Sequence, residues 1–248
     1  MLDLSSLNDA QREAVLTCEG PLLVLAGAGS GKTRVLTYRI AHLVEDCGVA
    51  PWNILAVTFT NKAAREMRDR LSTLAAGRLR GMWIYTFHSM CVRILRSHAT
   101  VLGYSDDFTI YDTDDSKRLI KDIMADYGYT GRSFSENAMR ARISACKNEL
   151  VSPGDYKPRA NDQFDKAFAE IFKAYQQRLK RANAMDFDDL LVNVYTLLSE
   201  HPDICQEYGQ RFHYILVDEY QDTNKAQYEI TKLLASGHGN LMVVGDDD

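Results

Sequence analysis

Short apolar runs alternate with amphipathic stretches along much of the chain. A strand in a parallel sheet reads as a continuous apolar run, because helices cover both of its faces. Stretches with helical periodicity follow these runs, which is the pattern of repeated strand–helix units. The predicted strands are Leu22–Leu25, Ile54–Phe59, Trp83–Thr86, Tyr214–Asp218 and Leu241–Gly245. The sequence therefore predicts an α/β fold with a parallel sheet, helices on both faces, and Leu22–Leu25 buried on both sides.

The helical stretches predict where the sheet is interrupted. Helices are expected from about Thr33 to Val44, Lys62 to Ala75, Ser89 to Ser97 and Lys225 to Ala235. Asn8 and Gln11 have the spacing of a capping box that opens a further short helix. From about Asp107 to Arg181 the pattern is helical throughout. We therefore predict a first part of the α/β domain at 1–106, an all-helical inserted subdomain at 107–182, and a second part at 183–248.

Composition supports a folded protein with separated charges. Of the 248 residues, 46% are hydrophobic, which excludes a disordered chain. The net charge is −5, but eight Lys or Arg face two acidic residues between Thr60 and Ala99, a local charge of +6. From Asn183 onward thirteen acidic residues face three basic ones, a local charge of −10. This separation suggests an anion-binding surface and an acidic region that could bind a metal.

Cysteine usage and the N-terminal residues bear on the compartment. The five cysteines are scattered and form no C-x-x-C pair, so neither a disulfide framework nor a zinc ribbon is predicted. The first residues lack the basic and apolar regions of a signal peptide, and no apolar run reaches the ~18 residues of a membrane span. We expect a cytoplasmic protein with no membrane partner.

A glycine-rich loop lies between the first predicted strand and the following helix. Residues 27–33 read GAGSGKT, the pattern of a phosphate-binding loop, with Ala26 where the strict pattern has glycine. Lys32 would contact the β- and γ-phosphates, and the Thr33 hydroxyl would bind Mg2+. A dinucleotide-binding loop fits poorly, because Lys32 occupies its third glycine position. The other candidate nucleotide-binding residues of this loop are Ala28, Gly29, Ser30 and Gly31.

Asp218 and Glu219 follow a predicted buried strand. At this position a carboxylate can meet the magnesium ion held by Thr33, so Asp218 is a candidate metal ligand and Lys32, Asp218 and Glu219 are catalytic candidates. Glu219 would orient and deprotonate an attacking water. A GTPase is disfavoured, because the nearest Asn-Lys-x-Asp candidate, at residues 61–64, lacks the aspartate.

Two further strand ends carry aromatic, hydroxyl and amide groups within the basic region. They are Thr58–Lys62 and Tyr85–Ser89. Aromatic rings stack on bases, while hydroxyls, amides and helix N-termini contact phosphates, which is the chemistry of sequence-tolerant single-strand binding. The alternative interpretation is that Phe59 and Phe87 are ordinary core aromatics.

Taken together, these motifs resemble superfamily 1A DNA helicases of the UvrD/PcrA/Rep family. The resemblance rests on GAGSGKT at 27–33, AVTFTNKAAREMR at 56–68, TFHSMCVRIL at 86–95, DFDDL at 186–190 and VDEYQDTNKAQY at 217–228. It implies a RecA-like domain with a helical insertion and ATP-driven 3′→5′ movement on DNA. ATP and Mg2+ would be the cofactors. Single-stranded DNA, junctions of single- and double-stranded DNA, and repair or replication proteins would be the partners.

The resemblance also implies roles for individual residues. Gln11 would contact adenine, and Arg34 would pack against the base. Gln221 belongs to the acidic motif and would link the nucleotide state to the DNA site. The residues that would touch single-stranded DNA are Phe59, Thr60, Asn61, Thr86 and His88.

One departure from the family pattern is large. The chain stops at Asp248, inside a motif that in the family resembles G-D-x-D-Q-S-I-Y, so it resembles the N-terminal portion of a helicase. Alone it is expected to be nearly inactive as an enzyme. Because it stops just after the predicted strand Leu241–Gly245, any later strand is expected to be missing and a sheet edge to lie bare. The alternatives are a non-catalytic module that binds DNA or a partner protein, and the motor part of a helicase–nuclease.

Overall fold

The computed structural model describes residues 2–27, 29–75, 77–129, 135–160 and 162–246. The chain forms two compact units: unit 1 contains residues 1–90, 198–223 and 227–248, and unit 2 contains 91–197 and 224–226. The domain ranges 1–106, 107–182 and 183–248 remain a prediction. None of the helices in the described ranges is both long enough and apolar enough to cross a bilayer.

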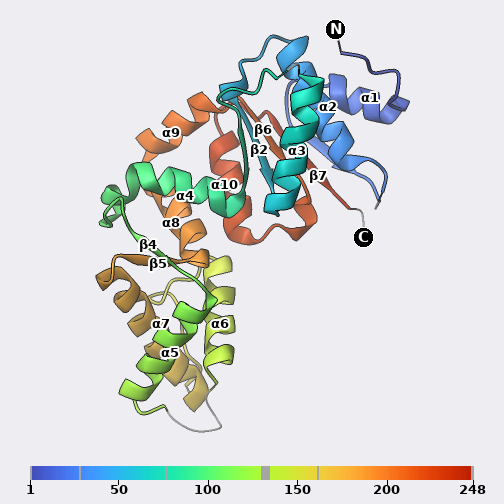
Figure 1. Ribbon diagram of the computed structural model, residues 1–248. Helices are drawn as coiled ribbons and strands as arrows, with labels where there is room; N and C mark the ends of the chain where they lie inside the picture. Colours follow the sequence, from blue (N-terminus) through green and yellow to red (C-terminus); the bar gives the residue numbers. More distant parts are fainter. Residues whose placement is uncertain (1, 28, 76, 130–134, 161, 247–248) are drawn as a thin grey trace. The chain divides into compact units, whose positions relative to one another are not determined.

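Unit 1 is built on a parallel sheet of five strands in the order β1-β7-β6-β2-β3. Figure 1 labels β2, β6 and β7 of this sheet. Cα partners such as Leu25 with Gly245 and Thr58 with Thr86 fix the register of its neighbouring strands. Because every pair is parallel, the carboxyl ends of all five strands lie along one edge. The strand bounds are β1 Leu22–Leu25, β2 Ile54–Thr58, β3 Trp83–Thr86, β6 Tyr214–Val217 and β7 Leu241–Gly245.

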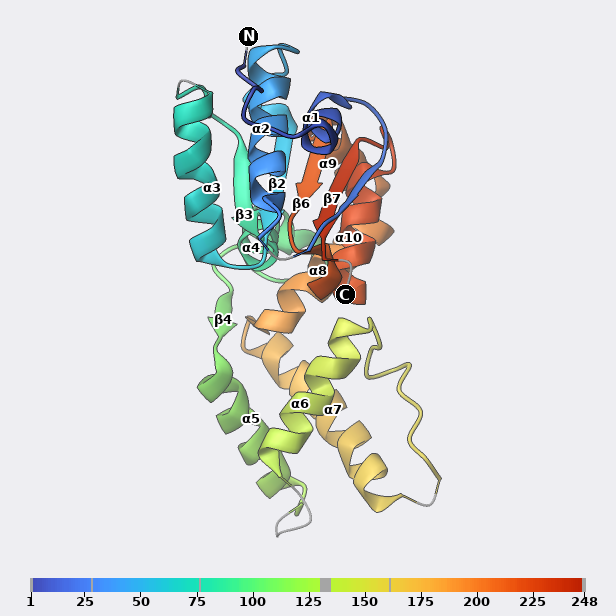
Figure 2. The same ribbon diagram turned by 90° about the vertical axis from the view of Figure 1, so that its right-hand side faces the viewer.

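Helices cover this sheet on two faces, as the sequence predicts. The connections β1–α2–β2 and β2–α3–β3 cross the sheet in one direction, and β6–α10–β7 crosses it in the other. Right-handed crossovers therefore place α2 and α3 on one face and α10 on the opposite face (Figure 2). The helix bounds in unit 1 are α1 Asp9–Leu16, α2 Lys32–Glu45, α3 Asn61–Leu74, α9 Pro202–Arg211 and α10 Lys225–Ala235, with short 3-10 turns η1 Pro51–Asn53 and η3 Tyr220–Asp222.

One prediction about the sheet was wrong. The strand Leu22–Leu25 was expected to be buried on both faces, but β1 is an edge strand, with Leu23 59% and Leu25 57% exposed. The last strand, β7, is not an edge, because it is hydrogen-bonded to β1 on one side and β6 on the other. An apolar run thus predicts a strand but not its neighbours.

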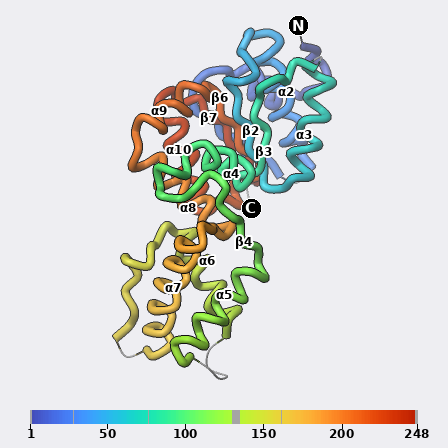
Figure 3. The backbone as a smooth tube through the Cα atoms, turned by 60° about the vertical axis from the view of Figure 1, so that its left-hand side comes forward, coloured from blue at the N-terminus to red at the C-terminus, as the bar shows by residue number. Residues whose placement is uncertain are grey.

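Unit 2 is mainly helical. Its core is formed by α5 Thr113–Asp126, α6 Glu136–Asn148 and α7 Gln163–Arg181 (Figure 3). The prediction of helix throughout 107–181 was wrong at β4, Thr109–Tyr111, which pairs in parallel with β5, Ala184–Asp186. Three-residue strands joined over such a sequence distance leave no local periodicity to detect. Two helices, α4 Phe87–His98 and α8 Phe187–Glu200, run from one unit into the other, and η2 is Ala99–Leu102.

A charged network is buried inside unit 2. The Nζ of Lys147 lies 2.7 Å from Asp186 Oδ2 and 2.8 Å from Asp189 Oδ1. Tyr175 donates a hydrogen bond to Asp186 (2.9 Å), and Gln176 donates one to Asp189 (2.7 Å). Burial opposes ionisation of Asp186, but the Lys147 ammonium and the hydrogen bonds from the Asp189 N–H and the Tyr175 hydroxyl outweigh it and lower its pKa. The network therefore holds α6, α7, β5 and α8 together.

Candidate functional site

The carboxyl edge of the sheet collects the residues that the sequence singles out in unit 1. Along the strand order β1-β7-β6-β2-β3, the glycine-rich loop follows β1 and the acidic pair follows β6. Phe59 to Asn61 follow β2, and Thr86 to His88 lie at the end of β3 and the start of α4. Crevices at the carboxyl ends of strands are where open α/β sheets bind ligands.

The glycine-rich loop has the backbone of an anion cradle. Gly29 (φ 76°) and Gly31 (φ 90°) adopt the left-handed conformation that glycine favours. The Ser30 N–H donates to Gly27 O (3.2 Å), which closes the turn. Gly31 is the N-cap of α2, and no side chain caps it, so the first N–H groups of this helix remain available to a ligand. Ala28 lies outside the described residues.

Lys32 is buried at the start of α2. It is 9% exposed, and its Nζ forms an ion pair with the carboxylate of Asp246, which follows β7. The Asp246 N–H donates to Gln221 Oε1 (3.1 Å). Asp246 was not among the predicted site residues. The available signal was three carboxylates directly after an apolar run, and the β1–β7 pairing explains why the first of them reaches this loop.

Asp218 and Thr33 meet beside Lys32. The Thr33 hydroxyl donates a hydrogen bond to the Asp218 carboxylate, which is 3% exposed. Burial, and next the negative charge of Glu219, raise the pKa of Asp218, whereas Lys32 and Thr33 act in the opposite direction. A buried carboxylate beside a hydroxyl is the hard oxygen donor set that Mg2+ prefers, so these residues fit that ion.

Glu219 sits on strained backbone. Its φ of 50° is left-handed, a conformation that costs a non-glycine residue about 1–3 kcal/mol. Its N–H donates to Asp218 Oδ1 (3.1 Å), and its carboxylate accepts from Gln221 Nε2 (2.7 Å). Gln221 thus contacts Glu219 with its amide nitrogen and the Asp246 backbone with its amide oxygen.

Gln11 and Arg34 flank the loop. Gln11 Oε1 accepts from the Asn8 N–H (3.2 Å) in the predicted capping box, and its Nε2 donates to Ser30 O (2.9 Å). Capping and loop contact are therefore made by one side chain. The Arg34 guanidinium lies 5.6 Å from the centre of the Tyr38 ring. A cavity of about 390 Å³ is lined by Arg34, Thr37, Tyr38, Arg70, Thr73 and Leu74.

The residues after β2 combine exposure with local structure. The Phe59 ring is half-buried and packs edge-on against Phe87, with centroids 5.7 Å apart, whereas Phe87 is 2% exposed. Thr60 is exposed and caps α3, because its Oγ1 accepts from the Ala63 N–H (3.0 Å). Asn61 is exposed at the first position of α3. Of the two aromatics, Phe59 is thus the one that solvent reaches.

The residues after β3 are more enclosed. Thr86 is 7% exposed, and its hydroxyl donates to Ser89 Oγ (2.9 Å) and accepts from the Ser89 N–H (3.2 Å). His88 is half-buried on the first turn of α4. The structure therefore brings all five DNA candidates to the ends of two adjacent strands, with Thr86 also serving the local fold.

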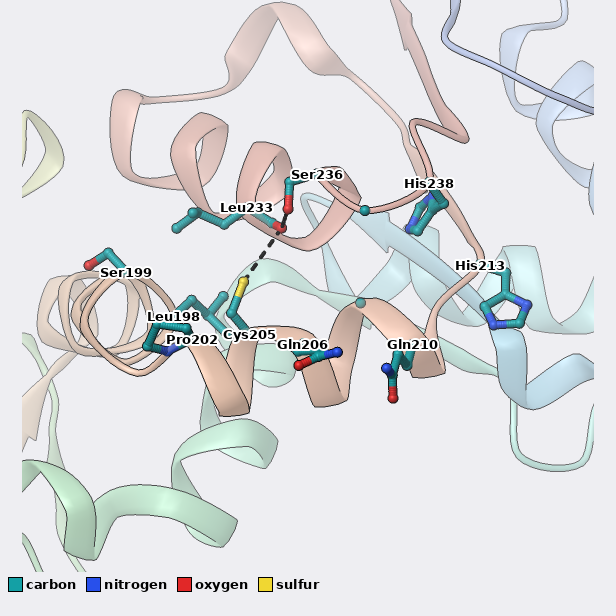
Figure 4. A pocket seen from close by; sticks show the side chains of 12 residues that line it. Leu198, Ser199, Pro202, Cys205, Gln206, Gln210, His213, Leu233, Ser236 and His238 are labelled. Carbon is teal, nitrogen blue, oxygen red and sulfur yellow. Dashed lines mark hydrogen bonds between the residues drawn. The ribbon is translucent and has the colours of Figure 1, made fainter.

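A groove of about 660 Å³ lies at the opposite edge of the sheet (Figure 4). Cys205 on α9 donates to Leu233 O on α10 (3.6 Å) at its base. His213 and His238 line it, and these residues precede the amino ends of β6 and β7. It is therefore separate from the edge that carries the glycine-rich loop.

A strand, a glycine-rich loop and a helix, with an acidic residue ending a nearby parallel strand, define the class of RecA-like P-loop folds. A sequence profile described as the UvrD/REP helicase N-terminal domain matches residues 7–248. The chain belongs to this family.

Curated relatives agree with this assignment. Each of three proteins named ATP-dependent DNA helicase PcrA is 49% identical to the chain over 245 residues. They come from Staphylococcus aureus strain Mu50, Leuconostoc citreum and Staphylococcus epidermidis strain RP62A. The matches cover 99%, 98% and 99% of this chain but 34%, 33% and 34% of the relatives. The chain thus spans about a third of the length of these relatives.

Proposed function

We propose that this chain is the ATP- and DNA-binding part of an ATP-dependent 3′→5′ DNA helicase motor. The observation that carries the proposal is the contact of Thr33 with buried Asp218, beside a buried Lys32 and the glycine-rich loop. The names of the relatives, which state ATP dependence and DNA helicase activity, support the same conclusion.

The loop and its neighbours would bind ATP. Backbone N–H groups from Ala28 to Gly31 would face the phosphates, and a phosphate would replace Asp246 as the partner of Lys32. Gln11 and Arg34 would contact the adenine, a role supported by the hydrogen bond of Gln11 to the loop and by the cavity beside Arg34.

Hydrolysis would depend on the acidic pair. Mg2+ held by Thr33 and Asp218 would neutralise developing phosphate charge. Glu219 would orient the attacking water and accept its proton. Its strained backbone and its hydrogen bond from Gln221 are consistent with a carboxylate held in one direction. Gln221 would transmit changes at the nucleotide to the neighbouring strand ends.

The ends of β2 and β3 would bind single-stranded DNA. Phe59 would stack on a base, and Thr60, Asn61, Thr86 and His88 would contact the strand. Junctions of single- and double-stranded DNA would be the substrates, and repair or replication proteins in the cytoplasm would be the partners. The proximity of β2 to β6 supports coupling, because these strands pair directly.

Glu219→Gln, examined in a full-length helicase context, tests the proposal. Nucleotide binding should persist while DNA-stimulated hydrolysis falls by at least about 10²-fold, because the proton acceptor is lost. Glu13→Gln, on the exposed side of α1, is the matched control and should hydrolyse ATP at the parental rate. Equal rates for both variants would remove Glu219 from the mechanism, and DNA binding without ATP turnover by the parent would favour the non-catalytic module.

A further inference from the structure

Two thiols and an imidazole come together at the end of α2 farthest from the glycine-rich loop. Cys18 follows α1, His42 is in the last turn of α2, and Cys47 follows that helix. The Sγ atoms of Cys18 and Cys47 are 3.4 Å apart, and Cys47 Sγ is 3.5 Å from His42 Nε2. All three atoms lie within 4.8 Å of one another. Such a convergence has no role in the proposed nucleotide or DNA chemistry.

The imidazole is already oriented toward the thiols. His42 Nδ1 lies 2.8 Å from Asp46 Oδ2, and Asp46 in turn accepts from the Leu2 N–H (3.2 Å to each oxygen). A carboxylate on one ring nitrogen fixes the tautomer and leaves the lone pair of the other nitrogen for a metal. Histidines that bind metals in proteins are typically held in this way.

The backbone of Cys18 is held from a different side. Arg39, which is 2% exposed, donates to Cys18 O (3.0 Å) and to Ala14 O (3.0 Å), and it also bonds Thr17 O. The guanidinium thus fixes the backbone after α1 and places positive charge close to both thiols. Cys47 is exposed, so an ion can reach the cluster from solvent.

We propose that Cys18, His42 and Cys47 form a binding site for one Zn2+ ion. Tetrahedral zinc with Zn–S near 2.3 Å and Zn–N near 2.0–2.1 Å separates its ligand atoms by about 3.5–3.8 Å. The observed 3.4 Å and 3.5 Å are close to this spacing. Two thiolates neutralise the ion, and water or an external ligand completes the fourth position. A disulfide would join the two sulfurs, but it would give no role to the contact between Asp46 and the His42 ring.

Zinc at this site would join the residue after α1 to the end of α2. Because Gln11 on α1 contacts the loop at the other end of α2, the ion would stabilise the helix pair that carries the nucleotide-binding loop. This effect is independent of whether the chain hydrolyses ATP, so the site can be tested by binding alone.

The test uses the purified 248-residue chain, kept reduced and stripped with a chelator. Titration with Zn2+ against a chromophoric chelator should give one equivalent, and Co2+ should give the visible bands of tetrahedral coordination with thiolate charge transfer. Cys18→Ser, Cys47→Ser and His42→Gln should each weaken zinc binding by at least about 10²-fold. Asp46→Asn, which keeps every ligand, should weaken it by about 10–100-fold. Cys205→Ser, a half-buried thiol far along the sequence, is the control and should bind like the parent.

Thermal unfolding with and without Zn2+ gives a second readout. The ion should raise Tm for the parent and for Cys205→Ser but not for the ligand variants, because only a folded site binds it. The proposal would be overturned if the double variant Cys18→Ser/Cys47→Ser bound zinc as tightly as Cys205→Ser does. The proposal would also be overturned if the reduced parent bound no zinc. The same holds if the parent bound no zinc and instead formed one disulfide per chain, with loss of two hydrogens, on mild oxidation.

Discussion

Two lysines, one in each unit, are buried to a similar degree but differ in how they are paired. Lys147 in unit 2 is 3% exposed and lies between Asp186 and Asp189, whose oxygens are also bonded by Tyr175 and Gln176. Lys32 in unit 1 is 9% exposed and pairs with Asp246, which is itself 30% exposed. A buried charge whose partners are all satisfied holds a fold together, whereas one held by a single accessible carboxylate can change partners.

Residues with strained backbone also divide, less sharply, into those that serve the fold and those in the candidate site. The non-glycine residues with positive φ among those described are Leu150, Asn183 and Glu219. Asn183 tolerates this conformation well, and its side chain bonds the Ser105 N–H (3.0 Å). Glutamate does not favour this conformation, and Glu219 lies in the acidic motif. Backbone strain therefore indicates a functional role only where the side chain belongs to a candidate site.

Removing Lys147 should have the largest effect on stability. Lys147→Ala leaves two buried carboxylates uncompensated, which should cost about 3–5 kcal/mol of unfolding free energy. Urea denaturation of the chain measures it, with Lys121→Ala on the exposed side of α5 as control. A loss no larger than that of the control would break the comparison.

Removing Lys32 should affect binding more than folding. A charge-assisted hydrogen bond to phosphate is worth about 1.5–3 kcal/mol, so Lys32→Ala should weaken ATP binding by about 10–100-fold. Its unfolding free energy should change far less than that of Lys147→Ala, because water can solvate the half-exposed Asp246. Calorimetry and urea denaturation on one preparation report both quantities. Similar losses of stability in the two lysine variants would show that Lys32 is structural.

The comparison extends to a pair of aromatics. Phe59→Ala should weaken binding of single-stranded DNA by about 1–3 kcal/mol, nearly independently of base sequence. Trp52→Ala removes an aromatic that is 56% exposed but precedes β2, at the other edge of the sheet, and should leave DNA affinity unchanged. Fluorescence anisotropy with a labelled oligonucleotide measures both. Unchanged affinity with a lowered Tm for Phe59→Ala would assign that ring to the core alone.

Asp218 should give the smallest effect, and one of opposite sign. Burial raises the pKa of Asp218 above its unfolded value, so the folded state binds this proton more tightly and ionisation costs stability as pH rises through that folded pKa. Asp218→Asn removes this cost and should raise stability at neutral pH, while weakening Mg2+-dependent nucleotide binding. Its stability should also depend less on pH than that of the parent across the range where Asp218 titrates. Destabilisation at neutral pH would show that the carboxylate is favourably paired.

Local patterns predicted more of this molecule than its long-range pairings. The strand ranges from the sequence agree with β1, β2, β3, β6 and β7 to within one residue, because an apolar run bounded by turns is a local signal. The sequence also selected Thr33 and Asp218, which the structure brings into contact. It could not supply the order of the strands, the β4–β5 pairing, the contact of Asp246 with Lys32, or the cluster of Cys18 with Cys47. Each of these depends on residues far apart in the chain.

The space around Gly245 limits which side chains this position can carry. A Cβ at this position would lie 2.9 Å from Gln221 Oε1 and 3.4 Å from Gln221 N, so alanine would displace the Gln221 side-chain oxygen that accepts from the Asp246 N–H. The demand is one of space rather than of backbone conformation, unlike that at Gly29 and Gly31. Substitution of Gly245 would therefore disturb the Gln221–Asp246 contact, which joins the turn after β6 to the end of the neighbouring strand β7.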